Sequence, residues 1–223
     1  MLTRRAVLVG ASFSLVAPSA QAGAPFYYKA WSFNTSAVPN QLSAALTQSL
    51  EAQIDIVEAL PLRPEVLRFF RDVDVKVDPA TLGKAAFYRS ERMRSARRRT
   101  SQEDTSARRG ATVHRIYIST KPAPPDNPVL LKMLLLAYMD RRVSDGDAAR
   151  VEDWLEDARR SGTFANRSDM MHEPEDFFAN SAGAVLLGRW PEEPFERAKV
   201  RDRLPAFYGW VMRELLADGA ALQ

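Results

Sequence analysis

Apolar residues recur at three- and four-residue steps over residues 41–60, the spacing that buries one face of a helix. The repeating positions are Leu42, Leu46, Leu50, Ile54 and Val57. Pro61 follows, and because proline cannot continue a helix, we expect this one to end there. A second, shorter helix is predicted over residues 63–70, with Pro64 in its first turn.

Residues 129–143 are the most apolar stretch beyond the N-terminal segment, and they leave almost no polar face. A helix that is apolar on all sides has to be enclosed on all sides, so we predict that it lies at the centre of the core. Further helices are predicted over residues 147–160, 175–187 and 205–216. Pro174 precedes the second of these and Pro205 begins the third, as proline often does at a helix start.

Apolar and charged residues alternate over residues 73–78, which predicts a half-exposed strand. Residues 113–118 (VHRIYI) are predicted to form a second strand. Residues 23–40 are rich in aromatic side chains without a regular period, and we expect an irregular arm that lies on the domain. These elements together predict a mainly helical α+β domain with a small β-sheet and a central buried helix.

The N-terminal 22 residues have the three parts of an export signal. Arg4 and Arg5 give a short charged region, an apolar run of about a dozen residues follows, and Ala20-Gln21-Ala22 is typical of a cleavage site. The paired arginines also resemble the twin-arginine type of signal. We therefore expect a periplasmic or extracellular protein with one domain over residues 23–223; an uncleaved N-terminal anchor is the alternative interpretation.

The composition of the chain limits the catalytic groups, metal sites and partners that it can have. The chain has no cysteine, which excludes a Cys nucleophile, Cys-ligated zinc and iron–sulfur clusters. It has only two histidines, His114 in a predicted strand and His172 in a predicted loop. Without the signal, Lys plus Arg falls from 31 to 29 against 28 acids, so the mature chain is nearly neutral and no nucleic-acid partner is expected. No later apolar stretch is long enough to predict a membrane span.

Several stretches carry a resemblance to a known family. The most specific are LLKMLLLAYMDRR at residues 130–142 and EDFFANSAGAVLLG at 175–188. A helix at 63–70, a strand that ends in Val77-Asp78-Pro79, a proline-rich loop at 121–128 and PAFYGW at 205–210 occur in the matching order. In this respect the chain resembles secreted bacterial zincin-like metallopeptidases, and the resemblance covers most of residues 23–223.

In that family the central helix carries a His-Glu-x-x-His motif, whose histidines bind zinc while the glutamate acts as general base. An acidic residue before Phe-Phe-Ala on a later helix supplies the third zinc ligand. By the resemblance, Lys132 stands at the first histidine position, Met133 at the glutamate, Leu136 at the second histidine and Asp176 at the third ligand. A leucine cannot bind zinc and a charged lysine has no lone pair to donate. The resemblance therefore implies the fold of a peptidase without catalytic residues, zinc or any other cofactor.

We accordingly expect a catalytically inactive domain that binds or scaffolds a peptide or a cell-envelope protein. Lys132 is predicted either to extend to solvent or to fill part of the lost zinc position beside Asp176. One alternative function is an active hydrolase with a rearranged site formed by His172, Glu175 and Asp176.

A basic segment near residues 89–110 offers another alternative, an envelope protein that binds an anionic partner. The candidate residues are Arg94, Arg97, Arg98, Arg99, Arg108 and Arg109. Polar and acidic residues are interspersed and aromatic residues are missing from its centre, so a solvated loop explains the same pattern.

Overall fold

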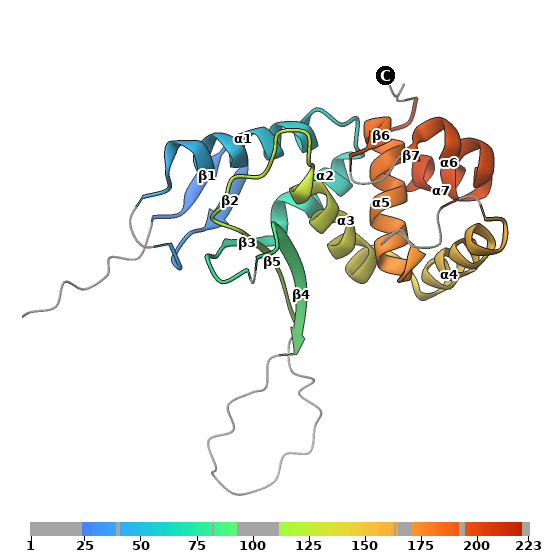
Figure 1. Cartoon of the computed structure of the whole chain (residues 1–223), viewed down its shortest axis with the longest axis horizontal. Helices are drawn as coiled ribbons and strands as arrows, with labels where there is room; N and C mark the ends of the chain where they lie inside the picture. The colour runs from blue at the N-terminus through green and yellow to red at the C-terminus, as the bar shows by residue number, and fades with distance from the viewer. Residues whose placement is uncertain are drawn as a thin grey trace, which may run out of the picture.

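The protein is represented by a computed structural model, which describes residues 24–38, 41–81, 83–92, 112–162, 164, 171–191 and 195–219. The predicted export signal at residues 1–22 lies outside these ranges. The described chain has the predicted class: it is mainly helical, with a small mixed sheet (Figure 1).

Seven helices are present in the described residues. They are α1 (Ala44–Glu58), α2 (Pro64–Asp72), α3 (Val129–Arg142), α4 (Asp145–Arg160), α5 (Pro174–Leu187), α6 (Arg197–Arg203) and α7 (Pro205–Leu215). The apolar periods thus predicted six helices correctly, with ends displaced by at most three residues. Helix α6 was missed because its short sequence is almost entirely charged and only Val200 is buried.

The main sheet has five strands in the order β1-β2-β3-β5-β4. Their bounds are β1 (Phe26–Tyr28), β2 (Trp31–Asn34), β3 (Asp74–Val77), β4 (Ala86–Arg92) and β5 (Thr112–Ile118). The central strand β3 runs parallel to both β2 and β5, whereas β1 and β4 pair antiparallel with their neighbours. A separate two-stranded ribbon joins β6 (Arg189–Trp190) to β7 (Phe195–Glu196).

Two expectations about the sheet were wrong. Residues 26–34 form strands β1 and β2 instead of an irregular arm, because Trp31 and Phe33 are buried in the core while Ser32 and Asn34 are exposed. The basic segment expected as a loop from residue 89 begins inside a strand, since Arg89 belongs to β4 and pairs in register with Arg115.

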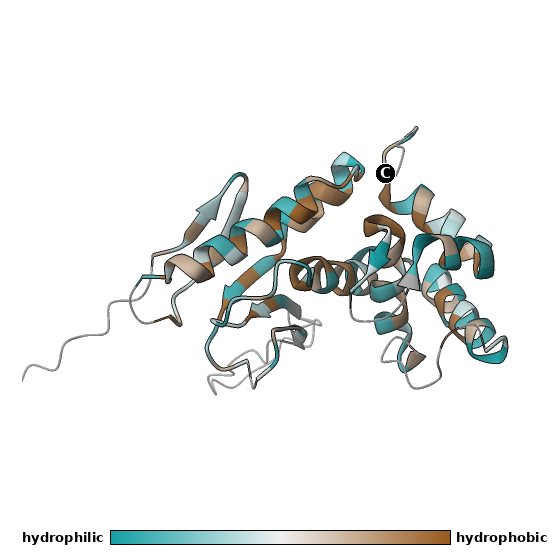
Figure 2. Cartoon of the chain, turned by 45° about the horizontal axis from the view of Figure 1, so that its top comes forward, coloured by the Kyte–Doolittle hydropathy of each residue, from teal (hydrophilic) through white to brown (hydrophobic). Residues whose placement is uncertain are grey.

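Helix α3 lies between the sheet and the other helices. It contacts β4 and β5 on one side and α5 on the other, with α1 and α2 also packed against it (Figure 1). Nine of its side chains are buried, and hydrophobic colour is concentrated on it in Figure 2, while the outer helices show more hydrophilic residues. Helices α4, α6 and α7 complete the second half of the molecule by packing around α5.

Gln53 of α1 forms hydrogen bonds at the start of α3. The first residues of a helix have backbone N–H groups without a partner inside the helix, and Pro128 gives α3 no side-chain cap. Gln53 is buried, and its Oε1 accepts a hydrogen bond from the Leu130 N–H at 3.1 Å. Its Nε2 donates to the Asn127 carbonyl at 2.8 Å, so one amide holds both the proline-rich loop and the helix.

A second polar cluster joins β2, α1 and α2. The Glu58 carboxylate accepts hydrogen bonds from Trp31 Nε1 at 2.6 Å and from Arg71 Nη2 at 2.7 Å. The Arg71 guanidinium, helped by Trp31, holds the pKa of Glu58 below its ordinary value.

Replacing Gln53 with alanine is expected to lower the free energy of unfolding by about 2–4 kcal/mol, because one buried and one partly buried backbone group lose their partners. Urea denaturation followed by circular dichroism measures this loss. Gln48→Ala is the matched control, since Gln48 is an exposed glutamine on the same helix and its loss should cost less than about 0.5 kcal/mol. Equal costs for the two variants would contradict the role given to Gln53.

Replacing Glu58 with glutamine is expected to cost about 2 kcal/mol at pH 7, because Arg71 loses a charged acceptor. The pKa of Glu58 is lowered from an ordinary 4.5 by folding, so its stabilisation is complete above that value and disappears as the pH falls through the lowered pKa. Urea denaturation at several pH values between about 7 and 3 should therefore show the two proteins converging in acid. Glu152→Gln, an exposed change on α4, should cost little at any pH.

Candidate functional site

A cavity of about 450 Å³ opens between β4, α3 and α5, and we call it the central cavity. Its walls are Lys84, Ala85, Ala86, Phe87, Tyr88, Asn127, Val129, Lys132, Met133, Leu136 and Asp176. Helix geometry explains the α3 contribution, because residues three and four apart project from one face. Lys132 and Leu136 therefore reach the same cavity, one turn apart.

The four positions singled out by the resemblance all line this one cavity. Lys132, Met133 and Leu136 come from α3, and Asp176 comes from the first turn of α5, forty or more positions later in the chain. Lys132, Leu136 and Asp176 are half-buried and Met133 is buried. The cavity wall thus combines an ammonium, a thioether, an aliphatic side chain and a carboxylate.

The pairing of Lys132 with Asp176 stays a prediction. Both side chains stand on the wall of the same cavity, which is the arrangement that such a pair requires. The backbone N–H of Lys132 donates to the Pro128 carbonyl at 3.1 Å, so Lys132 starts from the first turn of α3. Its side chain projects from the same helix face as Leu136, one turn later.

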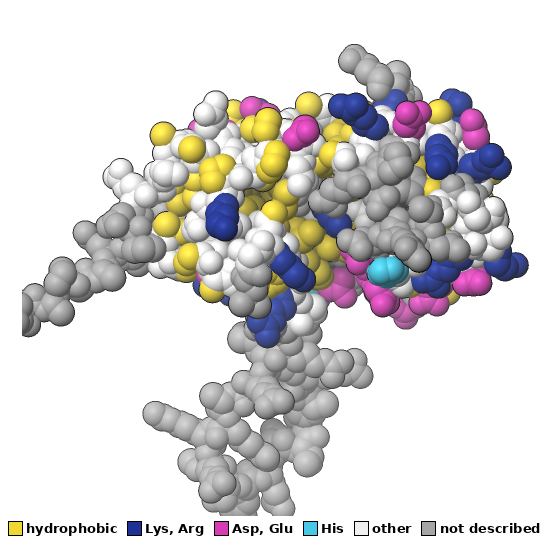
Figure 3. All heavy atoms as spheres, in the orientation of Figure 1, with side chains coloured by type: hydrophobic (Ala, Val, Ile, Leu, Met, Phe, Trp, Pro, Cys, Tyr) yellow, Lys and Arg dark blue, Asp and Glu magenta, His cyan; other side chains and the backbone are white. Residues whose placement is uncertain are grey.

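A second cavity, of about 410 Å³, adjoins the first, and we call it the acidic cavity. It is lined by Tyr88, Ser90, Leu136, Met139, Asp140, Val143, Asp145, Ala148 and Glu175. Tyr88 and Leu136 belong to the walls of both cavities, so the two are neighbours along β4. Three carboxylates from α3, α4 and α5 meet here, and Figure 3 shows acidic side chains gathered where these three helices come together.

Tyr88, His114 and Asp140 form a compact polar cluster beside the acidic cavity. The Tyr88 hydroxyl donates to Asp140 Oδ2 and lies 2.7 Å from His114 Nδ1, which is itself 2.9 Å from the same carboxylate oxygen. Burial, together with this carboxylate, raises the pKa of Tyr88 above its ordinary value, so the hydroxyl keeps its proton. His114 therefore has hydrogen-bonded partners within the fold, as expected for a strand histidine, and the cluster holds Tyr88 between the two cavities.

Strand β4 contributes Ala86, Phe87 and Tyr88 to the central cavity and Tyr88 and Ser90 to the acidic cavity. Ala86, Tyr88 and Ser90 alternate along the strand and so share a face. Among the described residues, β4 pairs with β5 alone, which leaves its other edge open to a further strand.

The alternative hydrolase site is not assembled. Asp176 lines the central cavity and Glu175 the acidic cavity, whereas His172 lines neither of them and is exposed. Among the described residues, no group of three or more His, Asp or Glu side chains is placed to hold a metal ion. The histidine and the two acids therefore do not form a shared site in this structure.

The predicted anionic-partner residues Arg94, Arg97, Arg98, Arg99, Arg108 and Arg109 lie outside the described residues. The described part of that segment is β4, where Arg89 is exposed. Its register neighbour Arg115 is paired with Asp74, with Nη2 and Oδ2 2.5 Å apart.

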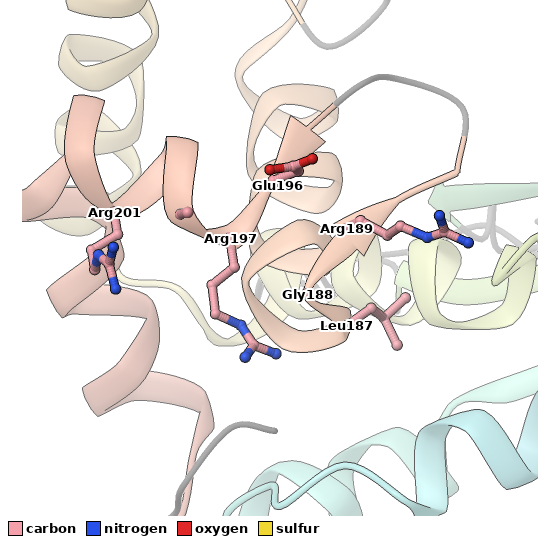
Figure 4. Close-up of a pocket in the computed structure, with 7 residues that line it drawn as sticks. Leu187, Gly188, Arg189, Glu196, Arg197 and Arg201 are labelled. Carbon is pink, nitrogen blue, oxygen red and sulfur yellow. The ribbon is translucent and has the colours of Figure 1, made fainter.

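A third cavity, of about 530 Å³, lies where α5 ends and α6 begins, and three arginines line it. Arg197 serves the fold: its Nε donates to the Val185 carbonyl at 2.7 Å and its Nη2 to the Leu186 carbonyl at 3.2 Å, which satisfies the end of α5. Figure 4 shows that the guanidinium groups of Arg189, Arg197 and Arg201 point in different directions. They do not converge on one anion, so this cavity is a structural junction.

Sequence reasoning missed the acidic cavity, because its residues are scattered from position 88 to position 175. Glu175 was considered as part of the alternative hydrolase site, and it lies in the first turn of α5. The aromatic pair Phe87-Tyr88 was the one available signal for β4, because aromatic residues favour strands.

Comparisons with models of protein families, with curated proteins and with solved structures found no match to this chain.

Proposed function

We propose that this protein is an exported, zinc-peptidase-like domain that binds an extended protein segment without cleaving it. The observation that supports this best is the meeting of Lys132, Met133, Leu136 and Asp176 on the wall of one cavity. The resemblance nominated these positions from two distant stretches of sequence, and a chance resemblance would not require them to share a cavity.

The chemistry of the wall argues against peptidase activity at this place. A zinc peptidase needs neutral imidazoles or carboxylates as ligands and a base for the zinc-bound water. The Lys132 ammonium has no lone pair, Leu136 has no donor atom, and the Met133 thioether is too weak a base to take a proton. Asp176 alone keeps a ligand type, and one carboxylate does not hold a catalytic zinc.

Binding is supported by the open edge of β4. An exposed strand edge offers unpaired N–H and C=O groups that an extended peptide can bond, while cavities beside it accept alternate side chains. Here the central and acidic cavities both border β4 and share Tyr88. The partner is accordingly a peptide or an extended segment of a cell-envelope protein.

The place of action rests on the N-terminal sequence, whose arginine pair, apolar run and Ala-Gln-Ala triplet indicate export to the periplasm or the medium. In the described residues, no helix is both long enough and apolar enough to cross a membrane.

The direct test is the zinc content of the purified protein, measured together with peptidase activity on the same sample. We expect far less than one zinc per chain and no cleavage of a casein substrate. Stoichiometric zinc accompanied by chelator-sensitive cleavage would overturn the proposal.

A gain-of-function variant tests the cavity assignment itself. Lys132→His combined with Leu136→His places two imidazoles one turn apart beside Asp176, and this variant is expected to bind about one zinc per chain. Lys132→His alone is the control and should bind zinc far more weakly, because it lacks one ligand. Adding Asp176→Asn to the double variant should abolish tight binding. A folded double variant that fails to bind zinc would contradict the family-like arrangement of these positions.

A further inference from the structure

The geometry points to a specific partner chemistry for the proposed binding groove: the acidic cavity takes a lysine or arginine side chain from the extended segment that lies along β4. This inference rests on the proposed function, because it assumes that a segment binds at this edge. Beyond the proposed function, the inference specifies that the bound segment carries a lysine or arginine at one position.

The walls of the acidic cavity offer apolar surface for the stem of a long cationic side chain and carboxylates for its charged end. Leu136, Met139, Val143 and Ala148 give apolar surface for a methylene stem. Asp140, Asp145 and Glu175 give carboxylates for an ammonium or guanidinium head, and no lysine or arginine is part of the wall. Lysine and arginine combine these two requirements, since their stems pack on apolar surface while the charge stays near water.

The carboxylates are available to a ligand to different degrees. Asp140 already accepts hydrogen bonds within the Tyr88–His114 cluster. Asp145 and Glu175 are exposed, and neither takes part in the ion pairs found among the described residues. Both lie in the first turn of a helix, Asp145 in α4 and Glu175 in α5. The nearby Arg141 stacks on Phe69, with its guanidinium carbon 5.2 Å from the ring centre, and does not line the cavity.

Strand geometry places a ligand side chain in this cavity. Tyr88 and Ser90 of β4 belong to its wall, and Ala86 and Tyr88 belong to the central cavity. A peptide paired with β4 has side chains on the same face about 7 Å apart at alternate residues. Two side chains of the peptide, from alternate residues on the same face, therefore reach the two cavities one after the other. Of the two cavities, only the acidic cavity has carboxylates in its wall without a lysine.

The test uses three acetylated and amidated seven-residue peptides of alternating threonine and valine. Their central residue is lysine, norleucine or glutamate, and their affinities for the full-length mature protein are measured by isothermal titration calorimetry. We expect the lysine peptide to bind roughly tenfold or more tightly than the norleucine peptide, and the glutamate peptide to bind most weakly. Raising the salt from about 0.05 to 0.5 M should reduce the preference for lysine.

Amino-acid substitutions test whether the preference for lysine comes from the acidic cavity. Asp145→Asn and Glu175→Gln, singly and together, should remove the preference for lysine while leaving norleucine binding unchanged. Asp153→Asn with Glu152→Gln is the matched control, because it removes two exposed acids of α4 that do not line the cavity. Circular dichroism of each variant establishes that it is folded, and the single variants serve if the double variant is not.

The outcomes separate the two proposals. Equal binding of the lysine and norleucine peptides overturns the charge preference and leaves a peptide-binding groove. A lysine preference that the control variant removes as well overturns the assignment to this cavity. Absence of binding by all three peptides overturns the groove itself, and the charge preference with it.

Discussion

The enclosure of α3 is the constraint on which the rest of the molecule depends. A helix with apolar residues on every face is stable only if protein covers all of them. The sheet covers one side and α5 the opposite side, while α1 and α2 complete the enclosure. Burial leaves the first turn of the helix without water, so its backbone needs a partner from another element. Gln53 supplies that partner, so the side-chain amide of α1 holds the start of α3 in place.

Helix α5 is the second support, and small residues allow it to come close to its neighbours. A Cβ atom added to Gly183 would lie 2.1 Å from the Trp190 ring, so only glycine permits this packing. The close approach seats the β6–β7 ribbon against α5. Because α5 also contacts α3, its first turn brings Asp176 and Glu175 to the two cavities. Packing that has no chemical role thus fixes the position of the acidic side chains.

The sequence predicted those parts of the fold in which a local period is strong. Six helices followed from apolar spacing and proline, β3 followed from alternation, and β5 was predicted as a second strand over residues 113–118. Strands β1 and β2 were missed because aromatic residues also occupy exposed positions there, as Tyr27 does, which hides the alternation. Strand β4 was missed because Ala86, Phe87 and Tyr88 are followed by polar residues without alternation. The four central-cavity positions came from the resemblance alone. No local pattern joins Tyr88, Asp140 and Glu175, since tertiary contacts bring them together.

The order of the strands also has a consequence for how the chain folds. Strand β3 has parallel neighbours on both sides, so neither pairing can form as a hairpin. Its partner β2 is separated from it by α1 and α2, and β5 is separated from it by β4. Strands that are far apart in the sequence pair slowly during folding, because the entropy of the long connecting loop is lost before any contact is gained. The two outer pairs, β1 with β2 and β4 with β5, are antiparallel and can form early. The centre of the sheet is then the last part to assemble, and the speed of that step sets how long the sheet edges stay exposed to other chains.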